Sequence, residues 1–153
     1  MNIKVEDIKK LREKTGAGIA DSRRALEEAG GDIKKAEELV KSWGIEKAAE
    51  KSDRAVKAGL VDAYIHGGSS RIGAMVEVNC ETDFVARTDE FRNLVREVAM
   101  QVSAMNPKDV EELMGQDYIR DSSKKIEQLV KETIAKVGEN IQIRRFARYE
   151  LGS

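Results

Sequence analysis

Three side chains in the middle of the chain belong to the types that form a nucleophile, a base and an orienting acid. Cys80 would supply the thiol, His66 the imidazole and Asp83 the carboxylate. Nucleophilic catalysis requires these groups to lie within hydrogen-bonding reach of one another. His66 ends a predicted strand beside a glycine loop, which favours an exposed or structural role. We therefore expect no catalytic residues, and a protein that is not an enzyme.

Two neighbouring acids and a glycine-rich turn are further candidates for chemistry. Glu81 and Asp83 could coordinate a cation or act as acid and base, but two carboxylates are an incomplete cage for a hard metal ion. The turn at 15–18, Thr-Gly-Ala-Gly, could cradle a phosphate. It lacks the preceding strand and the Gly-Lys-Ser/Thr pattern of phosphate-binding loops, which favours a structural turn. One His and one Cys also cannot make the usual zinc site. We expect neither a metal nor a cofactor.

The segment 79–87, Asn-Cys-Glu-Thr-Asp-Phe-Val-Ala-Arg, is unusual for its position. It starts with polar residues after a strand that looks buried, and it places Phe84 and Val85 before the next helix begins. In one interpretation Phe84 fills the core beneath that helix, since aromatic side chains usually bury. In the other, Phe84 projects with Asp83 toward a partner. The spacing alone favours the first interpretation.

The charge balance excludes several classes of protein. The 153 residues include 27 Lys and Arg against 28 Asp and Glu, which gives a net charge of −1. Such a chain has no general attraction for nucleic-acid phosphates, and its scattered aromatic residues, 5% of the total, do not form a stacking platform.

No apolar run approaches the ~18 residues of a membrane span, and the first residues show no signal-peptide core. A single cysteine fits a reducing compartment. We expect a cytoplasmic protein that binds neither nucleic acid nor membrane.

Apolar periodicity and glycine breaks predict three short helices in the first third of the chain. The ranges 5–14 and 20–29 are each followed by glycines, and a third helix starts after Asp32, a plausible N-cap. The range 47–57 is charged and rich in alanine, with few large apolar residues. It indicates a helical or extended linker that contributes little to the core.

After this linker the apolar period changes to two. Alternation over 60–66 and 71–80, around a Gly/Ser loop, predicts an antiparallel hairpin. The clearest helix covers 89–105 and ends at Asn106-Pro107. A short helical turn over 109–114, a helix from Ser122 or Ser123 to Val137, and a strand over 141–150 with continuous alternation complete the chain. The predicted fold class is α+β: a three-helix bundle, then a three-stranded antiparallel sheet packed with helices.

Three runs of sequence resemble the translation elongation factor Ts family, and together they cover nearly the whole chain. They are KLREKTGAGIADSRRALEEAGGDIKKAEELV, EVNCETDFVARTDEF and IAKVGENIQIRRFARYEL. This family exchanges guanine nucleotide on elongation factor Tu, the GTPase that carries aminoacyl-tRNA. The resemblance implies that residues 1–51 form a small helical domain similar to ubiquitin-associated domains. It also implies that 52–153, with a linker at 52–58, form the family's core and dimerisation region.

The resemblance also implies a set of partner-binding residues. The family's Thr-Asp-Phe-Val motif, which displaces Mg²⁺ from elongation factor Tu, matches Thr82, Asp83, Phe84 and Val85. Phe84 would enter an apolar gap between helices of the partner, and Asp83 would perturb the segments that hold Mg²⁺ and the nucleotide. Because Mg²⁺ demands near-octahedral oxygen ligands, a small displacement forfeits much of its binding.

The helical domain carries a second set of matched residues. Arg12, Ile19 and Ala20 match positions by which the family docks on the nucleotide domain of its partner. From the residues alone, Ile19 and Ala20 could equally pack at the start of a helix, and Arg12 could be a solvated charge.

Between Val110 and Ser122 the connection is shorter than in longer members of the family. We therefore expect a homodimer, because two copies would restore a double core and twofold pairs are the commonest oligomers. An alternative function is that of a ubiquitin-associated-like adaptor, whose helical domain binds peptides or ubiquitin-like folds.

Overall fold

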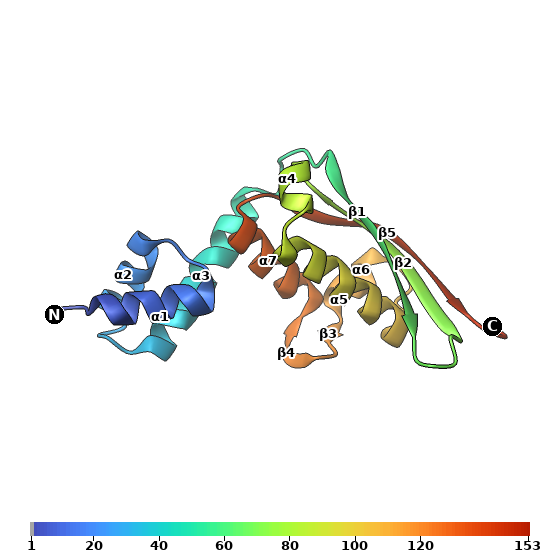
Figure 1. Cartoon of the computed structure of the whole chain (residues 1–153), viewed down its shortest axis with the longest axis horizontal. Coiled ribbons are helices and arrows are strands. Elements are labelled where there is room, and N and C mark those ends of the chain that lie inside the picture. The colour runs from blue at the N-terminus through green and yellow to red at the C-terminus, as the bar shows by residue number, and fades with distance from the viewer. Residues whose placement is uncertain (1) are drawn as a thin grey trace.

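The computed structural model describes residues 2–153, so Met1, where the expected helical domain begins, lies outside the described residues. Three helices form one end of an elongated molecule, and a sheet with its covering helices forms the other (Figure 1). The first part contains α1 (Val5–Thr15), α2 (Ile19–Glu28) and α3 (Ile33–Glu50). The second contains β1 (Ala58–His66), β2 (Ile72–Cys80), α4 (Asp83–Ala86), α5 (Asp89–Met105), α6 (Val110–Gly115), β3 (Asp117–Tyr118), β4 (Asp121–Lys125), α7 (Ile126–Val137) and β5 (Ile141–Glu150). The predicted α+β class is confirmed.

The three N-terminal helices enclose a small core of their own. Leu11, Leu26 and Ala36 have no exposed surface there. The Asp32 carboxylate accepts hydrogen bonds from the backbone N–H groups of Lys34 (2.9 Å) and Lys35 (3.2 Å), which confirms the predicted cap of α3. These features give the short helices fixed ends and one shared buried face.

The end of α3 belongs to the second core, contrary to the prediction for 47–57. The helix continues to Glu50, and Ala48 is 2% exposed among the apolar residues beneath the sheet. The reason is a close approach of α3 to α7. A Cβ placed on Gly44 would lie 2.9 Å from Cβ of Ala135, so only glycine fits at this point without a shift of the helices. Small residues, rather than large apolar ones, make this contact.

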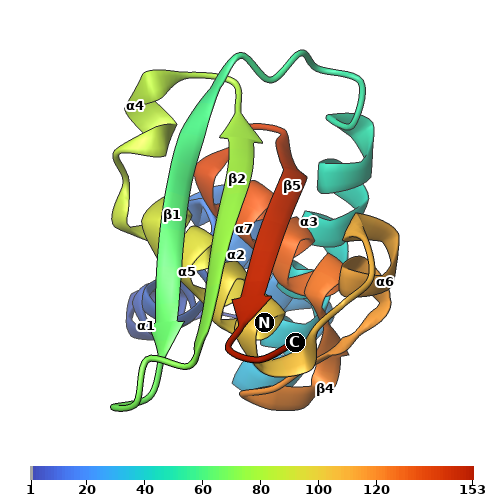
Figure 2. The same ribbon diagram turned by 90° about the vertical axis from the view of Figure 1, so that its right-hand side faces the viewer.

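The main sheet has the order β1-β2-β5, with every pair antiparallel, and the predicted hairpin is confirmed. Figure 2 shows α5 and α7 behind this sheet. Val76 and Val78 of β2 point to that inner face and are buried against α5, where Phe91, Val95 and Val98 are fully buried. The predicted range of α5 is confirmed. Its end at Asn106, in the left-handed region with φ 46°, is followed by Pro107.

The continuous alternation predicted for the last strand is wrong, because β5 contains a bulge. Val78 lies opposite Ile143 and Glu77 lies opposite Arg145, which leaves Arg144 as an extra residue. Ile143 faces the core before the bulge. After it the phase is inverted, and Phe146 packs against the core instead. The outer face of the sheet therefore carries different residues of β5 from those that simple alternation predicts.

The predicted helix start at Ser122 or Ser123 is also wrong, since both residues lie in β4 and α7 begins at Ile126. The Asp121 carboxylate accepts hydrogen bonds from both the backbone N–H (3.1 Å) and the hydroxyl (2.5 Å) of Ser123. This local turn competes with helix capping. It starts a short strand that pairs with β3, an element the periodicity did not predict.

Within residues 2–153, none of the helices combines the length and the apolar character needed to cross a membrane.

The close contact between α3 and α7 leads to a test of stability. We expect Gly44→Leu to lower the free energy of unfolding by about 1–3 kcal/mol, because the new side chain has no room beside Ala135. Urea unfolding followed by circular dichroism measures the change. Ser42→Leu, at an exposed position of the same helix, is the matched control and should stay within about 0.5 kcal/mol of the wild type. Equal midpoints for the two variants would show that the contact is loose.

Candidate functional site

The segment 82–85 is held by threonine caps at both of its ends. The Thr82 hydroxyl caps α4 by accepting a hydrogen bond from the Val85 N–H (3.3 Å). The Thr88 hydroxyl donates to the Val85 carbonyl (2.7 Å) and caps α5 by accepting from the Phe91 N–H (3.3 Å). The single turn of α4 is thus connected to a long helix by a fixed corner.

A carboxylate from another loop fixes the start of this segment. Oε1 of Glu139 accepts hydrogen bonds from the backbone N–H groups of Glu81 (3.1 Å) and Thr82 (2.9 Å). Its Oε2 accepts from the Thr82 hydroxyl (2.7 Å). In return, Oε1 of Glu81 accepts from the backbone N–H of Asn140 (3.0 Å). Each of these two loops, more than fifty residues apart in sequence, therefore supplies a carboxylate that accepts a backbone N–H of the other.

The connection after α3 is attached at the same point. The side chain of Asn140, only 2% exposed, donates hydrogen bonds to the carbonyls of Ser52 (3.2 Å) and Arg54 (2.8 Å). The Arg54 guanidinium lies 3.6 Å from Oε1 of Glu81. Glu139 and Asn140 were missed by the sequence analysis, since the only local signal is a polar pair between the glycine that ends α7 and an apolar strand.

With its ends fixed, α4 presents two of its side chains to solvent. Val85 and Ala86 are 4% and 3% exposed and pack into the core, while Phe84 is 81% exposed and Asp83 is also exposed. The interpretation of Phe84 as a core residue is therefore wrong. Neighbouring helical residues point about 100° apart, so a turn that buries Val85 and Ala86 turns Phe84 outward. Leaving a phenylalanine in water forgoes about 2–3 kcal/mol of burial.

The catalytic constellation considered for Cys80 and His66 is excluded by the hairpin. Cys80 pairs with Ala58 and His66 pairs with Ile72, at opposite ends of the two strands. Eight residue steps of ~3.4 Å, about 27 Å, separate them. Burial raises the pKa of the Cys80 thiol from its ordinary value of 9.0 to about 11, and the nearby carboxylate of Glu139 acts in the same direction. The thiol is protonated at neutral pH and is a poor nucleophile.

The acids of this segment do not form a metal site. Among residues 2–153, no group of three or more His, Cys, Asp or Glu side chains could hold a metal ion. The Glu81 carboxylate is occupied by the Asn140 N–H and faces Arg54. What the arrangement offers is a rigid corner with an exposed phenylalanine and an exposed carboxylate.

The second predicted set lies in the helical part, at the junction of α1 and α2. Nε of Arg12 donates to the Ala17 carbonyl (3.2 Å) and so joins α1 to the following turn. Ile19 is 61% exposed at the first position of α2, and Ala20 is exposed beside it. The interpretation of Ile19 and Ala20 as helix-start packing is therefore wrong. These residues and the segment 82–85 lie in different parts of the molecule, so a partner would have to span both to contact them together.

The clamp formed by Glu139 leads to a second test. We expect Glu139→Ala to lower the free energy of unfolding by about 2 kcal/mol, because two backbone N–H groups and one hydroxyl lose a charged acceptor. Urea unfolding measures the loss, and hydrogen exchange should show faster exchange at the amides of Glu81 and Thr82. Glu127→Ala, which removes only an exposed helical ion pair with Lys131, is the control. The clamp is unimportant if both variants unfold at the same midpoint.

Comparison with known proteins identifies the family. A family model described as Elongation factor TS matches residues 81–153, which include the capped segment and the Glu139 loop. Elongation factor Ts of Caldanaerobacter subterraneus subsp. tengcongensis is 43% identical over 98% of this chain and 97% of its own length. The same-named proteins of Thermoanaerobacter pseudethanolicus and Syntrophomonas wolfei are 44% and 41% identical over 98% of this chain, and over 95% and 91% of their own lengths.

These alignments also show that the relatives are longer than this chain. Each extends over 195 positions, 42 more than the 153 residues present here. The relatives therefore contain segments without a counterpart in this chain, although their identity extends from one end of it almost to the other. On the strength of this similarity, the chain belongs to the elongation factor Ts family.

Proposed function

We propose that this chain is a guanine-nucleotide exchange factor for elongation factor Tu, and that segment 82–85 disturbs the Mg²⁺ site of that GTPase. The observation that best supports the proposal is Phe84, a large apolar side chain that is 81% exposed on a turn whose ends are both fixed. An exposed phenylalanine on a rigid support is typical of an interaction site. Little conformational entropy is lost when such a side chain is buried in a partner.

In this mechanism Phe84 enters an apolar gap between two helices of the partner, and burial there recovers about 2–3 kcal/mol. The adjacent Asp83 then brings a negative charge toward the segments that hold Mg²⁺ and the phosphates. Displaced ligands no longer satisfy the octahedral geometry of Mg²⁺, and loss of the ion weakens phosphate binding. Thr82 and Val85 complete the proposed partner-binding segment and hold its turn in place, Thr82 through the clamp and Val85 through the core.

The exchange needs no covalent step, so the proposed protein is not an enzyme and uses no cofactor. It binds the nucleotide-free partner more tightly than the GDP-bound partner, and by linkage the nucleotide and the factor weaken each other to the same extent. Every 1.4 kcal/mol of this coupling changes affinity about tenfold. A cytoplasmic location, with no direct contact to nucleic acid or membrane, is part of the proposal.

The helical part would supply a second contact through Arg12, Ile19 and Ala20. We assign residues 1–51 to this docking domain and 52–153 to the core domain, with 52–58 as the linker. Two separate hydrophobic clusters support a division into two parts, one around Leu11 and Leu26 and one beneath the sheet, and the end of α3 contributes Ala48 to the second cluster.

A homodimer is the second part of the proposal, and the outer face of the sheet is its candidate interface. Met75 (54% exposed) lies between Ala63 and Ala147 of the neighbouring strands, and Gly73 lies between Ile65 and the exposed Tyr149. A sheet face that exposes large apolar side chains beside small residues in this way is normally covered by another element or by a partner.

A second copy of the chain fits this face because its charges are of both signs. Glu77 and Arg145 form an ion pair (2.9 Å) beside the apolar rows. A twofold partner that presents the same pair can place Arg145 near the other copy's Glu77, and large side chains opposite the small ones.

The exchange mechanism is tested by release of labelled GDP from elongation factor Tu. We expect Phe84→Ala and Asp83→Ala each to slow the stimulated release by about tenfold or more, the equivalent of about 1.4 kcal/mol of lost coupling. Both variants should unfold like the wild type, because both side chains are exposed. Leu151→Ala, at another exposed apolar position, is the matched control and should exchange normally.

Two results would contradict this assignment. Wild-type release rates in both variants would show that the segment is not the element that acts on Mg²⁺. No stimulation by the wild type, together with binding of a ubiquitin-like protein, would favour the adaptor function instead.

The dimer is tested by light scattering at micromolar concentration. We expect the wild type to have twice the mass of the 17.0 kDa chain, and Met75→Glu to have the mass of one chain, because a carboxylate at the centre of the apolar face is costly to bury. Met105→Glu, at an exposed position at the end of α5, is the control and should remain dimeric. A single 17.0 kDa species in the wild type would exclude the dimer.

A further inference from the structure

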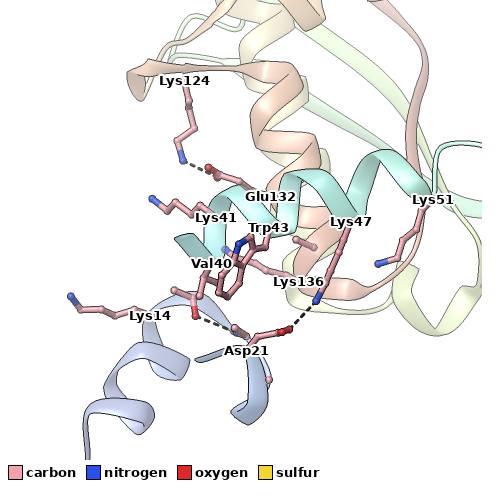
Figure 3. Close-up of a pocket in the computed structure, with 16 residues that line it drawn as sticks. Lys14, Asp21, Val40, Lys41, Trp43, Lys47, Lys51, Lys124, Glu132 and Lys136 are labelled. Carbon is pink, nitrogen blue, oxygen red and sulfur yellow. Dashed lines mark hydrogen bonds and ion pairs between the residues drawn. The ribbon is translucent and has the colours of Figure 1, made fainter. Parts of the chain in front are cut away.

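A cleft of about 320 Å³ lies between the helical part and α7 (Figure 3). The loop 15–18 forms one wall, α3 contributes Val40, Trp43 and Gly44, and α7 contributes Ala135. Trp43 lies in the middle of the lysines that Figure 3 labels. The size is that of a small-molecule site. Six lysines line the cleft: Lys14, Lys41, Lys47, Lys51, Lys124 and Lys136.

Positive charge in this cleft is in excess. Only two carboxylates line it, and both are paired: Asp21 with Lys47 (2.9 Å) and Glu132 with Lys124 (2.9 Å). A further lysine, Lys14, is paired with Glu37 outside the lining. The remaining three, Lys41, Lys51 and Lys136, form no ion pair with any residue of the described range 2–153.

The tertiary fold places these lysines around one cleft. Lys41 and Lys47 lie three residues before and three residues after Gly44, so they share its face of α3, and Lys51, the C-cap of this helix, lies one turn further on. The glycine contact brings α7 against that face. From α7, the stem of Lys136 reaches the loop, since its Cγ would lie 3.8 Å from a Cβ placed on Gly16. Like charges gathered in this way repel one another, which costs stability unless an anion lies among them.

We propose that this cleft binds a compact polyphosphate, either inorganic diphosphate or the diphosphate group of a nucleotide. A diphosphate concentrates several negative charges in a volume that the cleft can hold. Each ammonium group offers three N–H donors, and their hydrogen bonds to phosphate oxygens are charge-assisted. The loop 15–18 adds a wall with little side-chain bulk, because two of its four residues are glycine.

The single tryptophan of the chain makes the site directly observable, since Trp43 lies in its lining. We would titrate the wild-type chain with diphosphate and, separately, with ADP, and follow both Trp43 emission and the heat of binding. Sodium chloride at matched ionic strength controls for general screening. We expect saturable binding at one site per chain, with a change in emission that follows the calorimetric isotherm.

Matched triple variants locate the site. We expect Lys41→Gln, Lys51→Gln and Lys136→Gln together to weaken diphosphate binding by about tenfold or more, since three charge-assisted contacts are lost. The control, Lys9→Gln, Lys10→Gln and Lys34→Gln together, removes the same charge from exposed positions outside the cleft and should bind like the wild type. Equal affinity for diphosphate and ADP would assign recognition to the phosphates alone, and tighter binding of ADP would assign it to a nucleotide.

Three results would overturn the proposal. The first is the absence of saturable binding of both ligands in the calorimeter. The second is an equal loss of affinity in the two triple variants, which would indicate attraction to overall charge. The third is binding of a poly-glutamate peptide without binding of diphosphate, which would make the cleft a contact for an acidic protein segment. No assay in this design contains elongation factor Tu, so the result does not depend on the exchange proposal.

Discussion

The carboxylate of Glu139 is the interaction on which the exposed corner of this protein depends. It accepts three hydrogen bonds from Glu81 and Thr82, and the neighbouring Asn140 ties the connection after α3 to the same loop. A four-residue helix is far too short to be stable alone, because nucleation costs more than one turn of hydrogen bonds returns. Held at Thr82 by the clamp and at Val85 by the core, this turn keeps one orientation, and Phe84 keeps its direction.

The exposure of Phe84 is therefore a consequence of packing and not a local defect. Burying Val85 and Ala86 contributes to the core, and the helical phase then leaves Phe84 no place inside. The fold gives up about 2–3 kcal/mol of possible burial at this position. Interaction sites commonly contain a rigid, exposed apolar residue that lowers the stability of the free protein. The free energy of burying that side chain then becomes available when a partner covers it.

How far the sequence could predict this structure depended on whether the decisive contact was local. The range of α5 followed from apolar spacing and Pro107, and the cap of α3 followed from Asp32, since all of these act within a few residues. The side-chain turn of Asp121 and the bulge at Arg144 were not visible in periodicity, because both depend on partners that hydropathy does not show. General burial preferences of aromatic residues pointed Phe84 inward, whereas the burial of Val85 and Ala86 turns it outward on a segment that Glu139, more than fifty residues away, holds at Thr82.

The lysine cleft shows that the prediction of charged surfaces from sequence has the same limit. A net charge of −1 describes the whole chain, but it averages a cleft with six lysines and two acids against acidic surface elsewhere. The stripe on α3 can be read from helical spacing, whereas its juxtaposition with Lys136 requires the contact of Gly44 with Ala135. That contact also joins the two parts of the molecule. Repulsion among the lysines acts across this joint, so an anion in the cleft would strengthen it by linkage and would favour one orientation of the helical part.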